Sequence, residues 1–96
     1  MSNTLVIGQI DKRPDEILLR GLDWASVLAK IGGGVTLQTS SWYGDNCITL
    51  SSLSFAGSKT IVKISSGFAN NAYIIWNHVI LSDNQEYTRG LRVLVE

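Results

Sequence analysis

The sequence predicts an all-β protein, an antiparallel sandwich of six to seven short strands with one short helical turn near the N-terminus. From residue 35 onward, apolar and polar residues alternate with a period of two, and turn-forming Gly, Asn, Asp and Ser separate the alternating segments. The 96 residues suffice for one domain and are too few for two. This pattern is typical of an immunoglobulin-like β-sandwich, and the single cysteine, Cys47, excludes the internal disulfide of antibody domains.

The first segment is expected to be an extended N-terminal arm over residues 1–16, followed by the sandwich over residues 17–96. A charged run from Asp11 to Glu16 marks the arm, and Pro14 pushes Arg13 toward extended geometry. Such an arm becomes ordered on a partner, which makes Arg13 and Pro14 expected interface residues. The alternative is a solvated terminus.

Residues 17–24 are expected to form a strand that leads into the helical turn at residues 24–30. Asp23 caps this turn, and its apolar positions recur with helical spacing at Trp24, Val27, Leu28 and Ile31. Gly32, Gly33 and Gly34 end the helix. They do not resemble a phosphate-binding loop, because no Gly-Lys-Ser/Thr sequence follows them.

Five further strands are expected at 35–43, 47–53, 60–65, 72–81 and 87–95, with turns at 44–46, 55–58, 67–71 and 82–85. In the third of them Val62 and Ile64 point inward and Lys63 points outward. Trp42 is expected to fill the core between the two sheets.

The strand at 72–81 is unusual because both of its faces are largely apolar, whereas an antiparallel strand normally keeps one face for water. Tyr73 and Ile75 are expected to lie in the core. The opposite face is then an exposed apolar patch of the kind that marks interfaces, and we expect it to bind protein. The expected interface residues on this strand are Trp76, Ile74, His78 and Ile80. The alternative is burial of Trp76 under a neighbouring strand or the arm.

The charge balance argues against nucleic acid as a ligand. Eight Lys and Arg balance eight Asp and Glu, whereas phosphate binding needs a basic face. Charged residues make up only 17%, below the usual ~25%. We expect neither a membrane span nor a targeting segment, since no apolar run approaches about 18 residues.

No catalytic, cofactor-binding or metal site is expected. His78 is the only histidine and lacks the neighbouring ligands of a zinc site. A nucleophilic pair of Cys47 and His78 requires an activated thiol, and Cys47 opens a strand, away from any helix N-terminus. Trp42 and Trp76 are the alternatives considered for stacking against a sugar.

Several groups of residues together resemble a bacteriophage family. The stretch from Lys12 to Leu28 is similar to the opening K-x-P-D/A-E-x-L-D-Y-x-F/L-D-W-S-x-W-L of small phage tail and fibre–tail adaptor proteins. Ser40-Ser41-Trp42 resembles their S-x-W strand, and Ser65-Ser66-Gly67 their L/V-S-G-G turn. The stretch from Ala72 to Val79 resembles their Y-x-V-x-N-x-I/V strand, and the resemblance covers about residues 12–95.

The resemblance implies an immunoglobulin-like fold in a virion structural protein, an adaptor that joins fibres or other components to the tail or neck. It implies other virion proteins as partners, a homo-oligomer in a symmetric ring, and a place in the virion after assembly in the host cytoplasm. The alternative function is a capsid-decorating or host-adhesion module that binds carbohydrate. The chain departs from the family where Trp76 and Ile80 replace threonine and Leu18-Leu19-Arg20 replaces L-D-Y, so the partner surface is expected to be its own.

Overall fold

A computed structural model describes residues 6–44 and 46–96 of the chain, and it contains seven strands and one helix. The strands are β1 (Val6–Lys12), β2 (Leu18–Asp23), β3 (Leu37–Gly44), β4 (Ile48–Ala56), β5 (Lys59–Ser66), β6 (Asn71–Leu81) and β7 (Glu86–Val95), and the helix is α1 (Ala25–Ile31). The strands that period-two alternation predicts are confirmed to within a few residues at their ends. Asp45, in the middle of an expected turn, lies outside the described residues.

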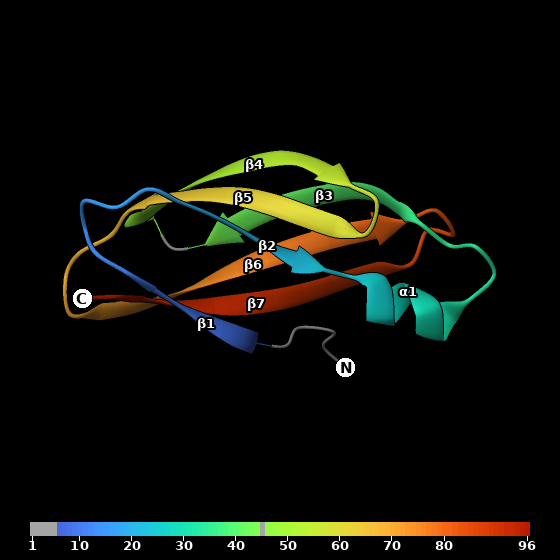
Figure 1. Ribbon diagram of the computed structural model, residues 1–96, viewed down its shortest axis with the longest axis horizontal. Helices are drawn as coiled ribbons and strands as arrows, with labels where there is room; N and C mark the ends of the chain where they lie inside the picture. The colour runs from blue at the N-terminus through green and yellow to red at the C-terminus, as the bar shows by residue number, and fades with distance from the viewer. Residues whose placement is uncertain (1–5, 45) are drawn as a thin grey trace.

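The strands form two sheets that pack face to face. One sheet has four strands in the order β1-β7-β6-β3, and the other has three in the order β2-β5-β4. In Figure 1, β4 lies along the upper margin, β1 along the lower margin and α1 at the right-hand end. The predicted β-sandwich is therefore confirmed.

The strand orders β2-β5-β4 and β7-β6-β3 correspond to the BED and GFC orders of immunoglobulin sandwiches. The immunoglobulin-like assignment itself stays a prediction that this order supports. All pairings are antiparallel except that of β1, which pairs in parallel with β7.

Part of the expected N-terminal arm lies in a sheet. Val6–Lys12 is extended and forms β1, paired from Val6 with Gly90 to Lys12 with Val95. Residues 1–5 of the expected arm lie outside the described residues, and the division of the chain at residue 16 stays a prediction.

The main core lies between the sheets because inward-facing residues alternate along β5, β6 and β7. Its buried members are Ile10, Trp42, Ile48, Val62, Ile64, Tyr73, Ile75, Leu91, Val93 and Val95. Trp42 is 7% exposed, which confirms that it fills the core. Tyr73 is also buried, and its hydroxyl oxygen accepts a hydrogen bond from the backbone N–H of Phe68 (3.1 Å).

A second cluster closes the end of the sandwich beside α1. Trp24, Leu37, Val79 and Leu81 are buried there, and the helix contributes its half-buried Val27, Leu28 and Ile31. The guanidinium of Arg89 lies 5.5 Å from the centre of the Trp24 ring, a cation–π contact. The helix ends at Gly32, whose φ of 73° is a left-handed conformation that glycine adopts without strain. The predicted helix and its apolar face are thus confirmed.

Candidate protein-binding site

A buried side chain in the middle of β6 fixes which face of this strand points outward. Asn77 is fully buried, and its Oδ1 accepts hydrogen bonds from Trp24 Nε1 (2.9 Å) and Thr60 Oγ1 (2.8 Å). Its Nδ2 donates to Ser40 Oγ (2.9 Å) and to the carbonyl oxygen of Ser41 (3.0 Å). An asparagine amide offers two donors and two acceptor positions, and all four are used. A one-residue slip of β6 would break this network and turn the strand inside out.

The outer face of β6 consequently carries the four residues expected to form an interface. Ile74 is 41% exposed, and Trp76, His78 and Ile80 are half-buried. The predicted division of β6 into a core face and an outer face is confirmed. The role of the outer face in binding stays a prediction.

Trp76 lies across a glycine of the neighbouring strand. It pairs in register with Gly90 of β7, and a Cβ atom at residue 90 would lie only 2.6 Å from Trp76 Cζ3. The indole therefore occupies the space that a side chain at residue 90 would fill. This packing against Gly90 explains why Trp76 is half-buried.

A surface hollow of about 460 Å³ opens beside Trp76, between β3 and β6. Tyr43 of β3, which is 50% exposed, pairs in register with Trp76 and forms one wall. Ile74, Ala72 and Gly44 line the rest. Two aromatic residues and an exposed isoleucine thus surround this depression.

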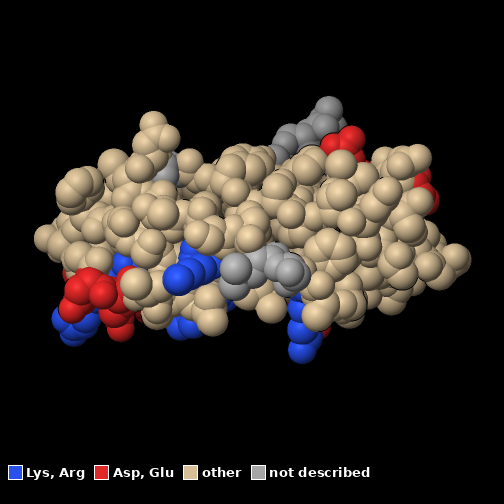
Figure 2. All heavy atoms as spheres, turned by 90° about the horizontal axis from the view of Figure 1, so that it is seen from above, with Lys and Arg blue, Asp and Glu red and all other residues tan. Residues whose placement is uncertain are grey.

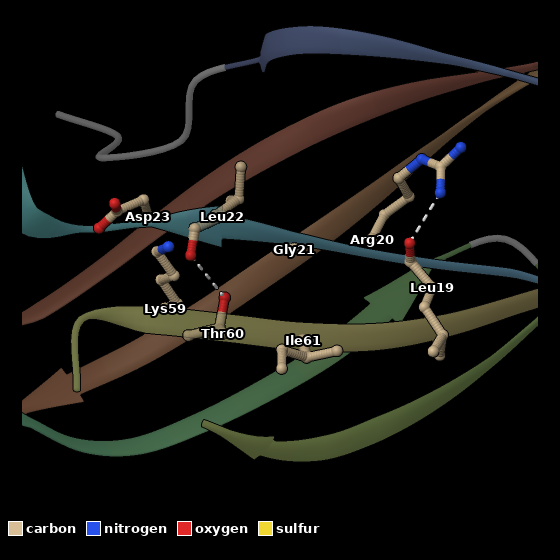
Figure 3. Close-up of a pocket in the computed structure, with 8 residues that line it drawn as sticks. All are labelled: Leu19, Arg20, Gly21, Leu22, Asp23, Lys59, Thr60 and Ile61. Atoms are coloured by element: carbon tan, nitrogen blue, oxygen red, sulfur yellow. Dashed lines mark hydrogen bonds between the residues drawn. The ribbon is translucent and has the colours of Figure 1, made fainter. Parts of the chain in front are cut away.

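A second groove, of about 510 Å³, runs between β2 and β5 (Figure 3). Leu19 (58% exposed), Gly21 and Ile61 line it, while Arg20 and Leu22 extend to the other side of β2. A Cβ at Gly21 would lie 1.9 Å from the carbonyl oxygen of Thr60, so only glycine permits this close approach of the strands. The groove is largely apolar at its centre.

One end of this groove is polar and carries Asp23 and Lys59. A hydrogen bond that Ser58 Oγ donates to Asp23 Oδ1 (2.8 Å) lowers the pKa of this carboxyl group. The backbone N–H of Ala25 (2.9 Å) and the charge of Lys59 lower it further. The expectation that Asp23 caps the helix is wrong, because Trp24 occupies the N-cap position and α1 has no side-chain capping hydrogen bond. Asp23 lies one residue earlier and, from the helix, accepts only the N–H of Ala25, the first residue of α1.

Arg13 and Pro14 are exposed, in the turn that follows β1. The ammonium group of the buried Lys12 holds this turn, because Lys12 Nζ donates to the carbonyl oxygens of Arg13 (2.8 Å) and Ser66 (2.7 Å). The backbone N–H of Arg13 also donates to Glu16 Oε1 (2.7 Å).

The structure does not bring this turn together with the outer face of β6. Strand β7 separates β1 from β6, and Trp76 is in register with the Val6 end of β1 rather than with the Lys12 end. The six expected interface residues therefore belong to two separate surfaces.

The side chains considered for catalysis have other surroundings. His78 Nδ1 lies 2.9 Å from Thr88 Oγ1, and His78 Nε2 lies 2.9 Å from Glu86 Oε1. Cys47 is exposed and directly precedes β4 of the three-stranded sheet, whereas His78 lies on β6 of the four-stranded sheet. Within residues 6–44 and 46–96, no three His, Cys, Asp or Glu side chains form a group that could hold a metal ion. None of the described helices is long and apolar enough to cross a membrane.

Sequence reasoning missed Tyr43, Gly44 and the β2–β5 groove. Tyr43 belongs to the site only through its pairing with Trp76, and the sequence pattern does not reveal the pairing of strands. One sequence feature could have pointed to the groove. Leu19 lies in the segment where the chain departs from the L-D-Y of the family it resembles. Trp76 is another residue that the resemblance marks as a departure, so each hollow contains at least one such residue.

Comparison with known proteins bears on the family of the chain. No curated protein matches the sequence. The family model described as podophage GP4 fiber-tail adaptor protein gp77 matches residues 12–94. The match covers the turn held by Lys12, the buried network around Asn77 and both surface hollows. The chain therefore belongs to the podophage GP4 fiber-tail adaptor protein family.

Proposed function

We propose that this tail-associated structural protein joins fibres or other components to the tail or neck of the virion through the outer face of β6. Its family of fibre–tail adaptors supports a role in binding fibre and tail components. The observation that carries the choice of surface is the apolar patch of Ile74, Trp76 and Tyr43 around a hollow.

The chemistry of this patch suits a protein partner. Aromatic residues in the centre of an interface contribute most of the binding free energy, and a polar rim surrounds them. Here the rim includes Arg92, which pairs in register with Ile74, and the hydrogen-bonded His78 and Glu86. The strands hold all these residues rigidly, so little conformational entropy is lost on binding.

Further details of the proposal concern assembly. The protein forms a symmetric homo-oligomeric ring, and Arg13 and Pro14 contact a neighbouring virion component. Lys12 supports this role because it fixes the turn that presents both residues. Assembly takes place in the host cytoplasm.

The test is the binding of fibre proteins to tails reconstituted with variants of this protein. Ile74→Asp is expected to weaken fibre binding at least tenfold, because it places a charge in the apolar patch, and Trp76→Ser is expected to act in the same direction. Ser26→Asp is the matched control, since Ser26 is exposed on α1, outside the sheet that contains β6, and this variant adds the same charge there. Circular dichroism verifies that each variant is folded.

Two results would overturn the proposal. One is fibre binding that is equal for folded Ile74→Asp, Trp76→Ser and the wild type. The other is binding of the isolated protein to a glycan array through Trp76, which would favour the carbohydrate-binding alternative. Trp42 takes no part in that alternative because it is buried.

A further inference from the structure

Strand β4 is an edge strand without the usual protection. The two sheets have four edge strands, β1, β3, β2 and β4. Edge strands of soluble proteins commonly carry charged residues, which discourage pairing with another chain. β1 carries Asp11 and Lys12, and β2 carries Arg20 and Asp23, whereas β4 has no charged residue along its nine positions.

Strand β3 is also uncharged, but β4 already covers part of its edge. The backbone N–H of Trp42 donates to Ser52 Oγ of β4 (3.0 Å). The pairing of β3 with β6 is also irregular, with a register shift between Leu37 and Thr39. The hydrogen bond from Trp42 uses a backbone donor of β3 but only a side chain of β4, so it leaves unused the backbone groups of β4 at Ile48–Ser52 that point away from β5.

The chain segment that contains β4 is also poor in charge, although β5 places Lys63 opposite Ser51 and Lys59 opposite Ala56. Residues 31–58 contain a single charged residue, Asp45. Figure 2 looks onto the molecule from the side where β4 lies in Figure 1. The surface in this view is mostly uncharged, and Lys, Arg, Asp and Glu lie mainly along its lower side and toward its right end, with one group of blue atoms nearer the middle.

We infer that β4 pairs with β4 of a second copy of this chain, antiparallel about a two-fold axis, so that two three-stranded sheets become one six-stranded sheet. From Ile48 to Ser52, β4 is paired residue by residue with β5, so its free edge is regular over this stretch. A two-fold axis places the same strand on both sides, and backbone groups of an antiparallel pair are self-complementary.

Side chains and charge favour a second copy as the occupant. Thr49 and Ser51 are exposed, and hydroxyl residues pair well across antiparallel strands. Leu50 is half-buried at the rim of the core, where a partner strand would cover it. The charged residue nearest along the ladder is Lys63 of β5, opposite Ser51. The two copies of Lys63 would be three strand spacings apart, about 14 Å. That separation exceeds the screening length of about 8 Å in physiological salt.

This pairing is separate from the proposed fibre contact, which lies on the other sheet. The first measurement is the molar mass of the purified protein by light scattering during size-exclusion chromatography. Without other virion components the wild type is expected to be a dimer, corresponding to two neighbouring copies within the proposed ring. Ser51→Lys is expected to raise the dimer dissociation constant at least tenfold because it places like charges beside the axis. Gln9→Lys, an equally exposed position on the opposite margin in β1, is the matched control and is expected to remain dimeric.

Amide hydrogen exchange provides a second readout that does not depend on a variant. Within Ile48–Ser52, the amides that point away from β5 are expected to exchange slowly in the dimer and faster on dilution into the monomer. A wild type that stays monomeric, or a dimer whose protected amides lie outside β4, would overturn the inference. Neither result affects the fibre-binding test, which depends on Ile74.

Discussion

Replacing Asn77 with alanine should show how much the buried network contributes to the fold. The variant removes the acceptor of the indole N–H of Trp24. The Trp24 residue is only 2% exposed, so this N–H is shielded from solvent. It also removes the acceptor of Thr60 Oγ1, although this hydroxyl can still donate to the carbonyl oxygen of Leu22 (3.4 Å). The buried indole N–H, left without an acceptor, is therefore expected to account for most of the lost stability.

A buried donor without a partner costs about 1–3 kcal/mol. The lost bonds to Ser40 and Ser41 and the small cavity add to this, so we expect Asn77→Ala to lower the free energy of unfolding by about 2–4 kcal/mol. A domain of this length has a total stability of about 5–14 kcal/mol. The variant should thus remain folded, and its urea midpoint should fall by about 1–3 M.

A double-mutant cycle with Trp24→Phe isolates the hydrogen bond between the two residues. Phenylalanine has no N–H, so Asn77→Ala should cost about 1–3 kcal/mol less in the Trp24→Phe background than in the wild type. Equilibrium urea unfolding of the four proteins gives the coupling energy. A coupling below about 0.5 kcal/mol would refute the reasoning, because the two substitutions would then be independent.

Two other predictions concern Trp76 and Asp23. Gly90→Ala should lower the free energy of unfolding by about 1–3 kcal/mol, because its Cβ would displace the Trp76 indole, and the same change should cost less in Trp76→Ser; equal costs would contradict the contact. The hydrogen bond from Ser58 and the N–H of Ala25 lower the pKa of Asp23 below its ordinary 3.8, so the carboxylate stabilises the fold above that pH and loses this effect as the pH falls through the folded pKa. Urea unfolding at several pH values should therefore show the stability difference between wild type and Asp23→Asn shrinking in acid, and a constant difference would exclude this role.

Local patterns in the sequence predicted the strands and the faces of β6. Tyr73, Ile75 and Val79 alternate with Trp76 and its neighbours, and the period-two rule assigned them correctly to the core. The apolar spacing from Trp24 to Ile31 likewise predicted α1. These features depend only on residues close together in the chain.

Features that depend on strand pairing were not predictable. The contact of Trp76 with Gly90 and its proximity to Tyr43 require the register of three strands. The pairing of Val6–Lys12 with β7 joins opposite ends of the chain. The charged run near the N-terminus did not predict that this segment forms a strand. The hollow above Gly21 results from a close backbone approach, which a pattern of side chains does not encode.

The network around Asn77 also bears on how such a protein can evolve. It anchors β6 entirely from within, through Trp24, Thr60 and the backbone of β3. Substitutions on the opposite side of the same strand leave those bonds intact. Under the proposed function, outward residues of β6 can therefore be exchanged to suit a different fibre without disturbing this network.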